Sequence, residues 1–466
     1  MPHTQNYRPS RAHAELGDAF FDTVEAARFP AHVIRYRNQP WAARVGLDAL
    51  TDEEWIAHFG RFEPLPGSFE EPLALRYHGH QFRHYNPDLG DGRGFLHAQL
   101  HDAADGRLLD LATKGSGTTP WSRGADGRLT LKGGIREVLA TSMLEALGVE
   151  TSKTFSLIET GEALMRNDEP SPTRSSVLVR LSHSHIRIGT FQRLAFNGDI
   201  EAIRRLLAHV VRYYLPEADA PDEADRAARF FQVCTARVAR MGAQWMAAGF
   251  VHGVLNTDNI NITGESFDYG PWRFLPRYEP DFTAAYFDHG GLYAFARQPE
   301  TLLWNLARLG GCLLPLGDEA DLKPRLQETL AGFGALVQAE FAQAVLARLG
   351  LKPIEPLRDA TVAGLFYSAL LESKAPFEQA FFDWRGGHPR RGDYSHAEFG
   401  PFRAALAGYE QTGPLHSYFE GDAPCTLLVE EVEALWAPIA EHDDWRSFQD
   451  KLNAIERIRG AYNLAA

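Results

Sequence analysis

The residues from His252 to Asn259, followed by Asp268, combine types that could bind a metal ion and handle a proton. The first stretch reads His-Gly-Val-Leu-Asn-Thr-Asp-Asn, and Asp268 stands nine residues after Asn259 at the start of Asp-Tyr-Gly. Asparagine and aspartate oxygens are suitable ligands for Mg²⁺ at a phosphate site. The spacing therefore predicts a metal site at Asn259 and Asp268, with Asp258 as the nearest candidate for a general base.

Protein kinases use the same spacing, with a catalytic loop H-R-D-x-x-x-x-N and a second metal ligand in D-F-G. When the histidine of that pattern is placed on His252, Asn259 and Asp268 fall on the two metal ligands. The kinase base falls on Val254, which can neither accept a proton nor orient a hydroxyl. The loop thus indicates phosphate chemistry without the ordinary kinase base. A polar turn after a helix explains the loop equally well if nothing upstream agrees.

Two glycine-rich stretches upstream are candidates for phosphate contacts. The first, Leu89-Gly90-Asp91-Gly92-Arg93-Gly94, would let the backbone take positive φ and approach a ligand. Arg93 offers a guanidinium fork for phosphate oxygens. A hairpin turn is the plainer explanation of this stretch taken alone. The second stretch runs from Gly124 to Arg128 and contains Asp126 and Gly127.

Lys114 and Glu137 could form the ion pair that holds nucleotide phosphates in a kinase small lobe. Residues 95–100 and 107–114 alternate apolar and polar side chains, which predicts a β-hairpin that ends at Lys114. A helical pattern at about 132–147 carries Glu137 in its first turns. Either residue alone would be an ordinary surface charge. Their order upstream of the His252 loop favours the pair.

The elements that must position these residues divide the chain into a strand-rich part and a helical part. Residues 12–60 look mostly helical, and 154–165 and 177–191 alternate as strands do. The second of these strands carries Arg180 and Arg187, which strict alternation would place on opposite faces. After about residue 198 helices dominate, and the helical patterns lie at 224–248, 300–314 and 324–349.

Composition excludes some classes of function. Of the 466 residues, 44% are hydrophobic and 23% charged, as in ordinary soluble proteins. A net charge of −14 argues against a nucleic-acid partner, because such binding needs a cationic surface. The three cysteines lie far apart, so we expect free thiols in a reducing compartment. Without a signal peptide or an 18-residue apolar stretch, we expect a cytoplasmic protein with no membrane partner.

Taken together, the motifs resemble those of the selenoprotein O family of pseudokinases, which act as protein adenylyltransferases. Arg83 departs from the family pattern, which usually has glycine after Gly-His-Gln-Phe. The matching motifs lie in one order and are Gly79-His80-Gln81-Phe82, Leu89-Gly90-Asp91-Gly92-Arg93, Lys114-Gly115-Ser116-Gly117, Ser122-Arg123, Asp126-Gly127-Arg128, Ile135-Arg136-Glu137, Arg180 with Arg187, His252-Gly253-Val254, Asn256-Thr257-Asp258-Asn259 and Asp268-Tyr269-Gly270.

The resemblance implies a bilobal protein-kinase-like α+β fold. We expect a strand-rich, nucleotide-binding small lobe at 1–195 and a helical large lobe with the catalytic loop and metal site at 196–466. ATP would be bound in the reverse of its kinase orientation, with Mg²⁺ or Mn²⁺ on Asn259 and Asp268 and with Asp258 as the base. The residues implied to contact the nucleotide are Gly90, Gly92, Arg93, Lys114, Asp126, Gly127, Arg180, Arg187 and Asp268.

The expected reaction is transfer of AMP from ATP to a Ser, Thr or Tyr hydroxyl of a protein substrate, with release of pyrophosphate. Such chemistry depends on positioning and charge neutralisation more than on a protein nucleophile. Two alternatives stay open. The same fold could move the γ-phosphoryl group, or UMP with Mn²⁺. The chain could also be a nucleotide-binding scaffold without transferase activity, which Val254 would suit.

Overall fold

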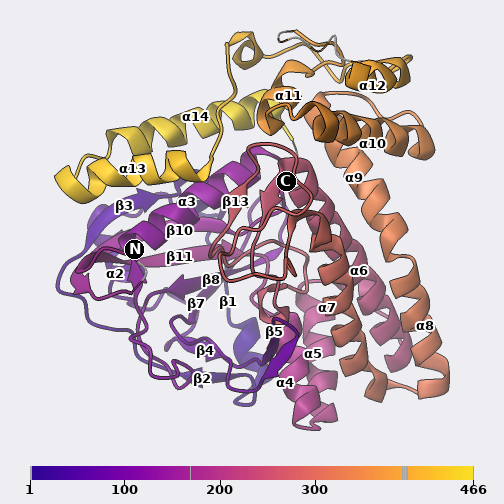
Figure 1. Cartoon of the computed structure of the whole chain (residues 1–466). Helices are drawn as coiled ribbons and strands as arrows, with labels where there is room; N and C mark the ends of the chain where they lie inside the picture. The colour runs from indigo at the N-terminus through magenta and orange to yellow at the C-terminus, as the bar shows by residue number, and fades with distance from the viewer. Residues whose placement is uncertain (1–2, 168, 391, 393, 395–396, 465–466) are drawn as a thin grey trace.

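An antiparallel sheet occupies the first part of the chain and helices make up most of the rest (Figure 1). The computed structural model describes residues 3–464 except 168, 391, 393 and 395–396. The short strands β1 (Pro9–Ser10) and β9 (Leu129–Thr130) pair with β7 and β11. The order of the other strands is β2 (Phe21–Thr23), β4 (Leu73–Leu75), β7 (Leu96–His101), β8 (Leu108–Lys114), β11 (Thr173–Ser182), β10 (Lys153–Leu164) and β3 (Val33–Arg37).

The hairpin predicted to end at Lys114 is confirmed as β7 and β8. Its strands pair Leu100 with Leu109, and β8 then pairs with β11 in the middle of the sheet. Consecutive residues Val177, Leu178 and Val179 of β11 are all buried, because both faces of the sheet are covered. A central strand of this kind carries a continuous apolar run.

Helix α3 (Leu131–Ala146) covers one face of the sheet, as predicted from the pattern at 132–147. Thr130 caps its N-terminus by accepting a hydrogen bond from the backbone of Gly133. Glycine inside a helix costs roughly 1 kcal/mol relative to alanine. Gly134 is nevertheless needed here, since a Cβ atom on it would lie 2.4 Å from Leu157 of β10. The helix therefore lies close to the sheet and brings Glu137 over β8.

The other face is covered by the segment that the sequence suggested to be mostly helical. It contains α1 (Gln39–Arg44) and α2 (Asp52–Phe59), and its buried side chains include Trp41 and Trp55. The expectation was wrong in part, because this segment also supplies β2 and β3. Pairing of β3 with β10 overrides the local helical pattern.

The strand expected at 177–191 was too long. β11 ends at Ser182, and α4 (Ile188–Phe196) begins directly after Arg187. The backbone N–H groups of His183 and His185 donate to the carboxylates of Glu265 and Asp110 at 2.7 and 2.9 Å. Beyond Ser182, these N–H groups are therefore bonded to side-chain carboxylates and not to the backbone of a neighbouring strand, and the chain leaves the sheet.

The helical part is built around α6 (Glu223–Ala248), which ends at Gly249 in the left-handed conformation, as expected. The pattern at 324–349 is split at Gly332 into two helices.

By length and composition alone, the segment Glu319–Leu349 could cross a membrane. The other helices here are α5 (Ile200–Tyr213), α7 (Gln298–Leu313), α8 (Glu319–Ala331), α9 (Phe333–Leu349), α10 (Pro356–Ser373), α11 (Phe377–Asp383) and α12 (Gly400–Ala405).

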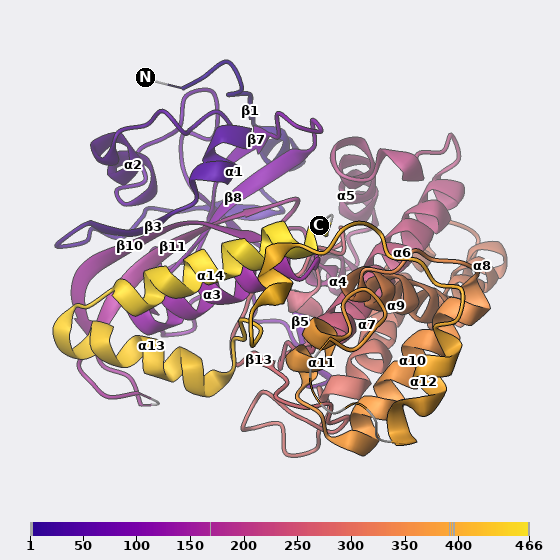
Figure 2. The same cartoon turned by 90° about the horizontal axis from the view of Figure 1, so that it is seen from above.

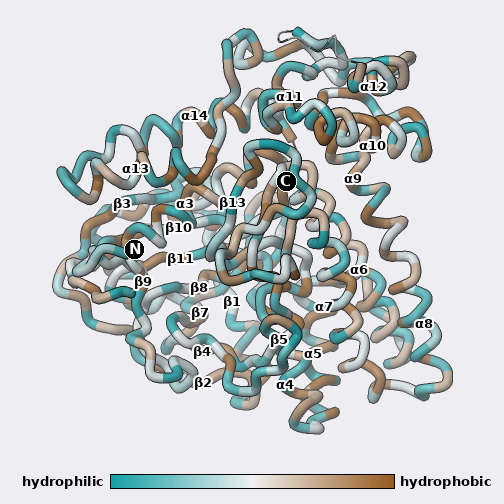
Figure 3. Tube along the Cα trace, viewed as in Figure 1, coloured by the Kyte–Doolittle hydropathy of each residue, from teal (hydrophilic) through white to brown (hydrophobic). Residues whose placement is uncertain are grey.

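The last two helices, α13 (Val429–His442) and α14 (Arg446–Tyr462), return to the strand-rich part. Helix α14 lies along α3, as Figure 2 shows from above. Arg459 of α14 is 3.0 Å from Glu145 of α3, and Glu433 of α13 is 2.7 Å from Lys132. Brown and teal residues alternate along both helices in Figure 3, which is typical of helices with one buried face.

Candidate functional site

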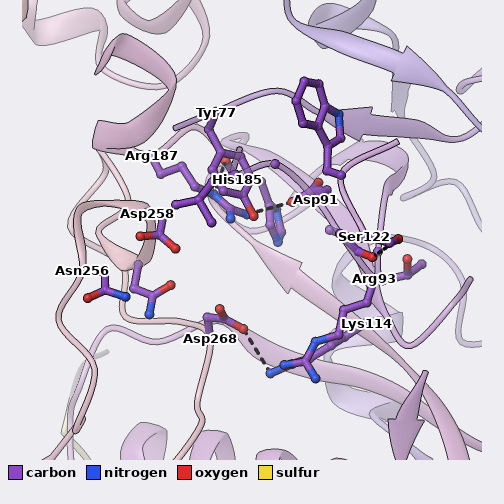
Figure 4. A pocket seen from close by; sticks show the side chains of 18 of the residues that line it. Tyr77, Asp91, Arg93, Lys114, Ser122, His185, Arg187, Asn256, Asp258 and Asp268 are labelled. Atoms are coloured by element: carbon purple, nitrogen blue, oxygen red, sulfur yellow. Dashed lines mark hydrogen bonds and ion pairs between the residues drawn. The ribbon is translucent and has the colours of Figure 1, made fainter. Parts of the chain in front are cut away.

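A pocket of about 410 Å³ lies where the end of β8 meets the loops around residues 90, 122 and 256. Figure 4 shows Asp258 and Asn256 on one side of it, Arg93 and Lys114 on the other, and Asp268 between them. The polar and charged residues that line the pocket are Tyr77, Gln81, Asp91, Arg93, Thr113, Lys114, Trp121, Ser122, Arg123, Arg180, His185, Arg187, Asn256, Asp258, Asn259 and Asp268.

Three buried charges, those of Lys114, Glu137 and Arg180, form a network with the half-buried Asp268 on one wall. Nζ of Lys114 lies 2.7 Å from Oε2 of Glu137 and 3.0 Å from Oδ1 of Asp268. Arg180 reaches the same two carboxylates, at 2.8 Å from Glu137 and 2.7 Å from Asp268. Arg180 comes within reach because its β11 strand pairs with the β8 strand of Lys114. The ion pair expected from the order of elements is therefore present, and Arg180 joins it.

The charges in this network change one another's pKa values. Burial alone would raise the pKa of Asp268, but the charges of Lys114 and Arg180 hold it well below its usual value. Burial lowers the pKa of Lys114, and the two carboxylates oppose that effect. Asp268 also adopts a left-handed backbone, with φ of 63°. Such strain in a non-glycine residue persists where the surrounding structure enforces it, commonly at functional sites.

Asp258 is the least satisfied carboxylate of the pocket. Its side chain is buried, and Oδ1 has no hydrogen-bond partner among the described residues. Burial raises the pKa of Asp258 to about 7. A buried carboxylate without a partner is costly unless a proton or cation joins it. The space around it is tight, since a Cβ atom on Gly79 would lie 2.8 Å from Oδ1.

The loop that carries Asp258 is fixed from three sides. His252 Nε2 lies 2.9 Å from the carbonyl oxygen of Phe267, the residue before Asp268. The hydroxyl of Thr257 accepts a hydrogen bond from the backbone of His80 at 2.7 Å. The backbone of Phe82 donates to Asn256 at 3.2 Å. The last two bonds tie the loop to the hairpin of β5 (Gly79–Gln81) and β6 (His84–Asn86).

The turn of that hairpin places Phe82 and Arg83 in the left-handed conformation, with φ of 49° and 65°. Two successive positive φ angles are typical of the tightest hairpin turns. Glycine adopts them without strain, which explains why a family pattern would favour glycine where Arg83 stands.

Arg187 lies at the end of the pocket away from Lys114. Its guanidinium stacks 4.1 Å over the ring of Tyr77 and lies 3.4 Å from Oδ1 of Asp91. Burial would lower the pKa of Arg187, but nearby Tyr77 and Asp91 raise it, so the guanidinium stays charged. The pocket thus has cationic groups at both ends.

A divalent cation fits the oxygen atoms between these ends. The side-chain N–H of Asn259 donates to the carbonyl of Val254 at 3.0 Å, which leaves the amide oxygen for a cation. Asp268 offers a carboxylate with a low pKa. Within the described ranges, no three His, Cys, Asp or Glu side chains form a metal-binding group. Mg²⁺ would therefore need phosphate oxygens as well, as it commonly does.

Most of the predicted site residues meet in this pocket. Asp126 and Gly127 do not line it: Asp126 pairs with Arg166 at 2.8 Å beside it. Glu137 lies behind Lys114 rather than in the wall. The predicted residues that line the pocket are Gly90, Gly92, Arg93, Lys114, Arg180, Arg187, Asp258, Asn259 and Asp268.

The expected role of the first glycine stretch needs correction. Gly90, Gly92 and Gly94 do not have positive φ. They are small because neighbours crowd them: a Cβ atom on Gly90 would lie 2.3 Å from the Trp121 ring, and one on Gly94 2.1 Å from the carbonyl of Thr113. Close packing of protein on protein, and not backbone conformation, requires glycine at these positions.

Sequence reasoning also missed several residues of the pocket. Asp91, Ser122, Arg123 and Asn256 stand within motifs that were noted, but no role followed from their types. Trp121 directly precedes one such motif and could have been found as the partner of the glycines. His185 was treated as a strand residue and had no signal as a pocket residue.

Comparison with known proteins agrees with this site. Residues 3–392 match the model of the family described as protein adenylyltransferase SelO. A protein nucleotidyltransferase YdiU from Trichormus variabilis is 43% identical, over 97% of this chain and 96% of the relative. A YdiU from Gloeobacter violaceus is 43% identical over 99% and 96%, and one from Synechococcus elongatus is 53% identical over 75% and 69%.

A pocket with cationic ends and carboxylate and amide oxygens between them, together with these matches, defines an enzyme of the nucleotidyltransferase class. The chain belongs to the protein adenylyltransferase SelO family.

Proposed function

We propose that this enzyme transfers AMP from ATP to a Ser, Thr or Tyr hydroxyl of a protein substrate, with Mg²⁺ bound at Asn259 and Asp268. The observation that carries the proposal is Asp258. It is a buried, unpartnered carboxylate beside Asn259, whereas the kinase base position holds Val254. Attack on a phosphorus close to Asp258 needs no group at residue 254. The family name and the relatives' names support nucleotidyl transfer.

The proposal includes a kinase-like division of the chain. Residues 1–195 would form the nucleotide-binding lobe and residues 196–466 the lobe with the catalytic loop. The sheet, the Lys114–Glu137 pair and α3 support the first assignment. The long α6 that leads into His252 supports the second. Free cysteines support a reducing, cytoplasmic location.

The residues of the chain would act mainly by position and charge. Lys114 and Arg93 on one side and Arg187 on the other would hold the phosphates as charge-assisted donors. Asp258 would take the proton of the acceptor hydroxyl. Mg²⁺, when bound, would offset the charge that develops on the phosphate oxygens. Preorganised charges of this kind supply most of the catalysis in phosphate transfer.

The test uses ATP labelled at the α or γ phosphate, and UTP labelled at the α phosphate with Mn²⁺, in a lysate of protein acceptors. We expect label from α-ATP to stay on protein and label from γ-ATP not to. Stable γ label would indicate a kinase, and labelling from UTP with Mn²⁺ alone would indicate UMP transfer. Binding of ATP without any label on protein would indicate a nucleotide-binding scaffold that has no transferase activity. Each of these outcomes contradicts the proposal.

A further inference from the structure

Two neighbouring aromatic residues, Tyr286 and Phe287, are exposed to solvent. Tyr286 is 84% exposed, the highest fraction for a large apolar residue in the part of the chain that the structure describes, and Phe287 is 43% exposed. Their ring centroids lie 5.1 Å apart in an edge-to-face arrangement. Contiguous exposed aromatic side chains commonly mark a surface that binds a partner.

The segment that carries these rings is packed against the loop that carries Asp258. Ala284 and Ala285, which directly precede the rings, are both buried. Gly253 of the loop leaves room for them, since a Cβ atom there would lie 3.0 Å from the side chain of Ala284 and 3.6 Å from the backbone nitrogen of Ala285. Val254, the next residue of the loop, lines the pocket. The two rings are therefore anchored beside the pocket wall.

Phe287 also contacts the hairpin of β5 and β6, on which the same loop rests. Its ring centroid lies 5.8 Å from that of Phe82, which in turn lies 4.8 Å from that of Tyr293. The backbone N–H of Phe82 and the hydroxyl of Tyr293 both donate to Oδ1 of Asn256, at 3.2 and 2.8 Å. Asn256 lines the pocket on the same side as Asp258 (Figure 4). A chain of direct contacts thus leads from Phe287 to the Asp258 side of the pocket.

Two charged side chains next to these aromatic residues already have partners. The guanidinium of Arg83 lies 3.4 Å from the carboxylate of Glu300. The carboxylate of Asp288, directly after Phe287, accepts two backbone N–H groups of the following turn at 2.9 and 2.8 Å. These charges are therefore less available to a partner than the exposed rings are, and the surface suits an apolar contact.

We propose that Phe82, Tyr286 and Phe287, here called the aromatic rim, bind the acceptor protein and select hydroxyl groups that have an apolar side chain close by in the acceptor chain. The inference rests on the proposed function, since it requires an acceptor whose hydroxyl reaches Asp258. The acceptor must approach that carboxylate from solvent. A segment that brings its hydroxyl there also comes close to the rim, because the rim is joined by contacts to Asn256. Aromatic side chains often supply much of the binding free energy at such contacts.

The rim should act on binding of the acceptor and not on the transfer step. It would touch neither the phosphates nor the hydroxyl proton. Contacts that are equally strong before and during the reaction lower KM and leave kcat unchanged. The rim should therefore lower the KM for the acceptor, with no effect on the KM for ATP. Replacement of Asp258, in contrast, should lower kcat.

The first test identifies the modified sites. The wild type and the double variant Tyr286→Ser/Phe287→Ser transfer AMP to the proteins of a lysate, and mass spectrometry locates the modified hydroxyls. We expect apolar residues to be enriched beside the sites of the wild type, relative to all Ser, Thr and Tyr residues of the same proteins. The double variant should lose this enrichment. Leu357→Ser is the control, because Leu357 is 73% exposed on α10, which contributes no residue to the lining of the pocket.

The second test uses pairs of synthetic peptides that carry a single Ser, Thr or Tyr, flanked by leucine in one peptide and by glycine in the other. The double variant should raise the KM of the preferred leucine-flanked peptide by roughly tenfold or more. Its kcat and its KM for ATP should stay at the wild-type values. Fluorescence anisotropy of the same peptides, with a non-hydrolysable ATP analogue present, measures binding without any transfer. Circular dichroism confirms that each variant is folded.

Equal KM values for the wild type and the double variant would overturn the inference, as would modified sites without apolar neighbours. Both results can occur in an enzyme that transfers AMP, so the inference can fail while the proposed function stands. Peptide binding that depends on the rim in a protein without transferase activity would support the surface and refute the function. Analytical ultracentrifugation covers one more occupant. A wild-type dimer that dissociates in the double variant would show that the rim joins two copies of this chain, and would overturn the inference.

Discussion

Oδ1 of Asp268 lies 3.0 Å from Nζ of Lys114, so a predicted metal ligand and a predicted phosphate ligand are paired with each other. When a nucleotide and its cation bind, each residue must exchange part of this contact for its ligand. Lys114 and Arg180 are both also paired with Glu137, so neither is left unpaired by the exchange. Glu137 thus keeps the wall of the pocket in place while Asp268 turns to the metal.

Replacing Asp268 tests the metal assignment. Asp268→Ala should abolish transfer from α-labelled ATP, because the phosphate charge at the reacting centre would lose its metal ligand. The fold should survive, since Glu137 still pairs with both cations. A filter assay for labelled protein gives the rate, and thermal unfolding checks the fold. Near-normal transfer by a folded variant would show that Asp268 is not a metal ligand.

Replacing Lys114 and replacing Glu137 should have different effects, the first on nucleotide binding and the second on stability. Lys114→Ala should lose nucleotide binding while Glu137 keeps Arg180 as a partner. Glu137→Gln should lose stability, by up to about 3–5 kcal/mol, because the two buried cations Lys114 and Arg180 would then share the single carboxylate of Asp268. Urea unfolding and nucleotide titration measure the two effects. If Glu137→Gln were as stable as the wild type, Glu137 would not hold the network as described.

Asp258 should be essential for rate and not for binding. Asp258→Asn keeps the shape of the side chain and removes the base, so transfer should fall by roughly 10²–10⁴-fold while ATP binds with similar affinity. Single-turnover labelling and equilibrium binding separate the two quantities. A variant that labels protein at the wild-type rate would remove Asp258 from its proposed role.

Gly79 should influence the reaction without touching a ligand. A Cβ atom there would lie 2.8 Å from Oδ1 of Asp258, so Gly79→Ala should displace that carboxylate and lower the rate at least tenfold. Gly364→Ala is the control, because nothing lies within 4 Å of a Cβ atom at that helical position. Comparing the initial rates of both variants tests the crowding around Asp258. Equal rates would mean that the loop adjusts freely.

Glu159 should make the stability depend on pH. It accepts hydrogen bonds from Arg35 at 2.7 Å and from Arg174 at 2.6 Å, and these arginines hold its pKa below the usual value although burial alone would raise it. A lowered carboxylate pKa stabilises the fold above the unfolded pKa of about 4.5, and this contribution is lost as pH falls. The melting temperature of Glu159→Gln should therefore lie furthest below that of the wild type near pH 7. A difference in melting temperature between the two proteins that does not change with pH would contradict this account.

The sequence predicted the parts of the site that depend on order along the chain. Lys114 at a strand end, Glu137 in the next helix and Asp268 after the His252 loop each follow from local patterns. Asp126 could not be placed, because its pairing with Arg166 depends on how two loops meet. His185 was missed for a related reason. The carboxylates that end β11 come from residues 110 and 265, far away in the sequence. Helix α14 on α3 likewise had no local signal.

The contact of α14 with α3 also affects how the protein is made. Roughly 300 residues separate the two helices, so at 5–20 residues per second α3 waits about 15 to 60 s on the ribosome for its covering helix. During that time the residues of α3 that α14 covers are open to solvent or to chaperones. Pulse proteolysis of stalled nascent chains should find the strand-rich part sensitive until α14 has emerged. The strand-rich part would thus gain its full stability only late in synthesis, when α14 covers α3.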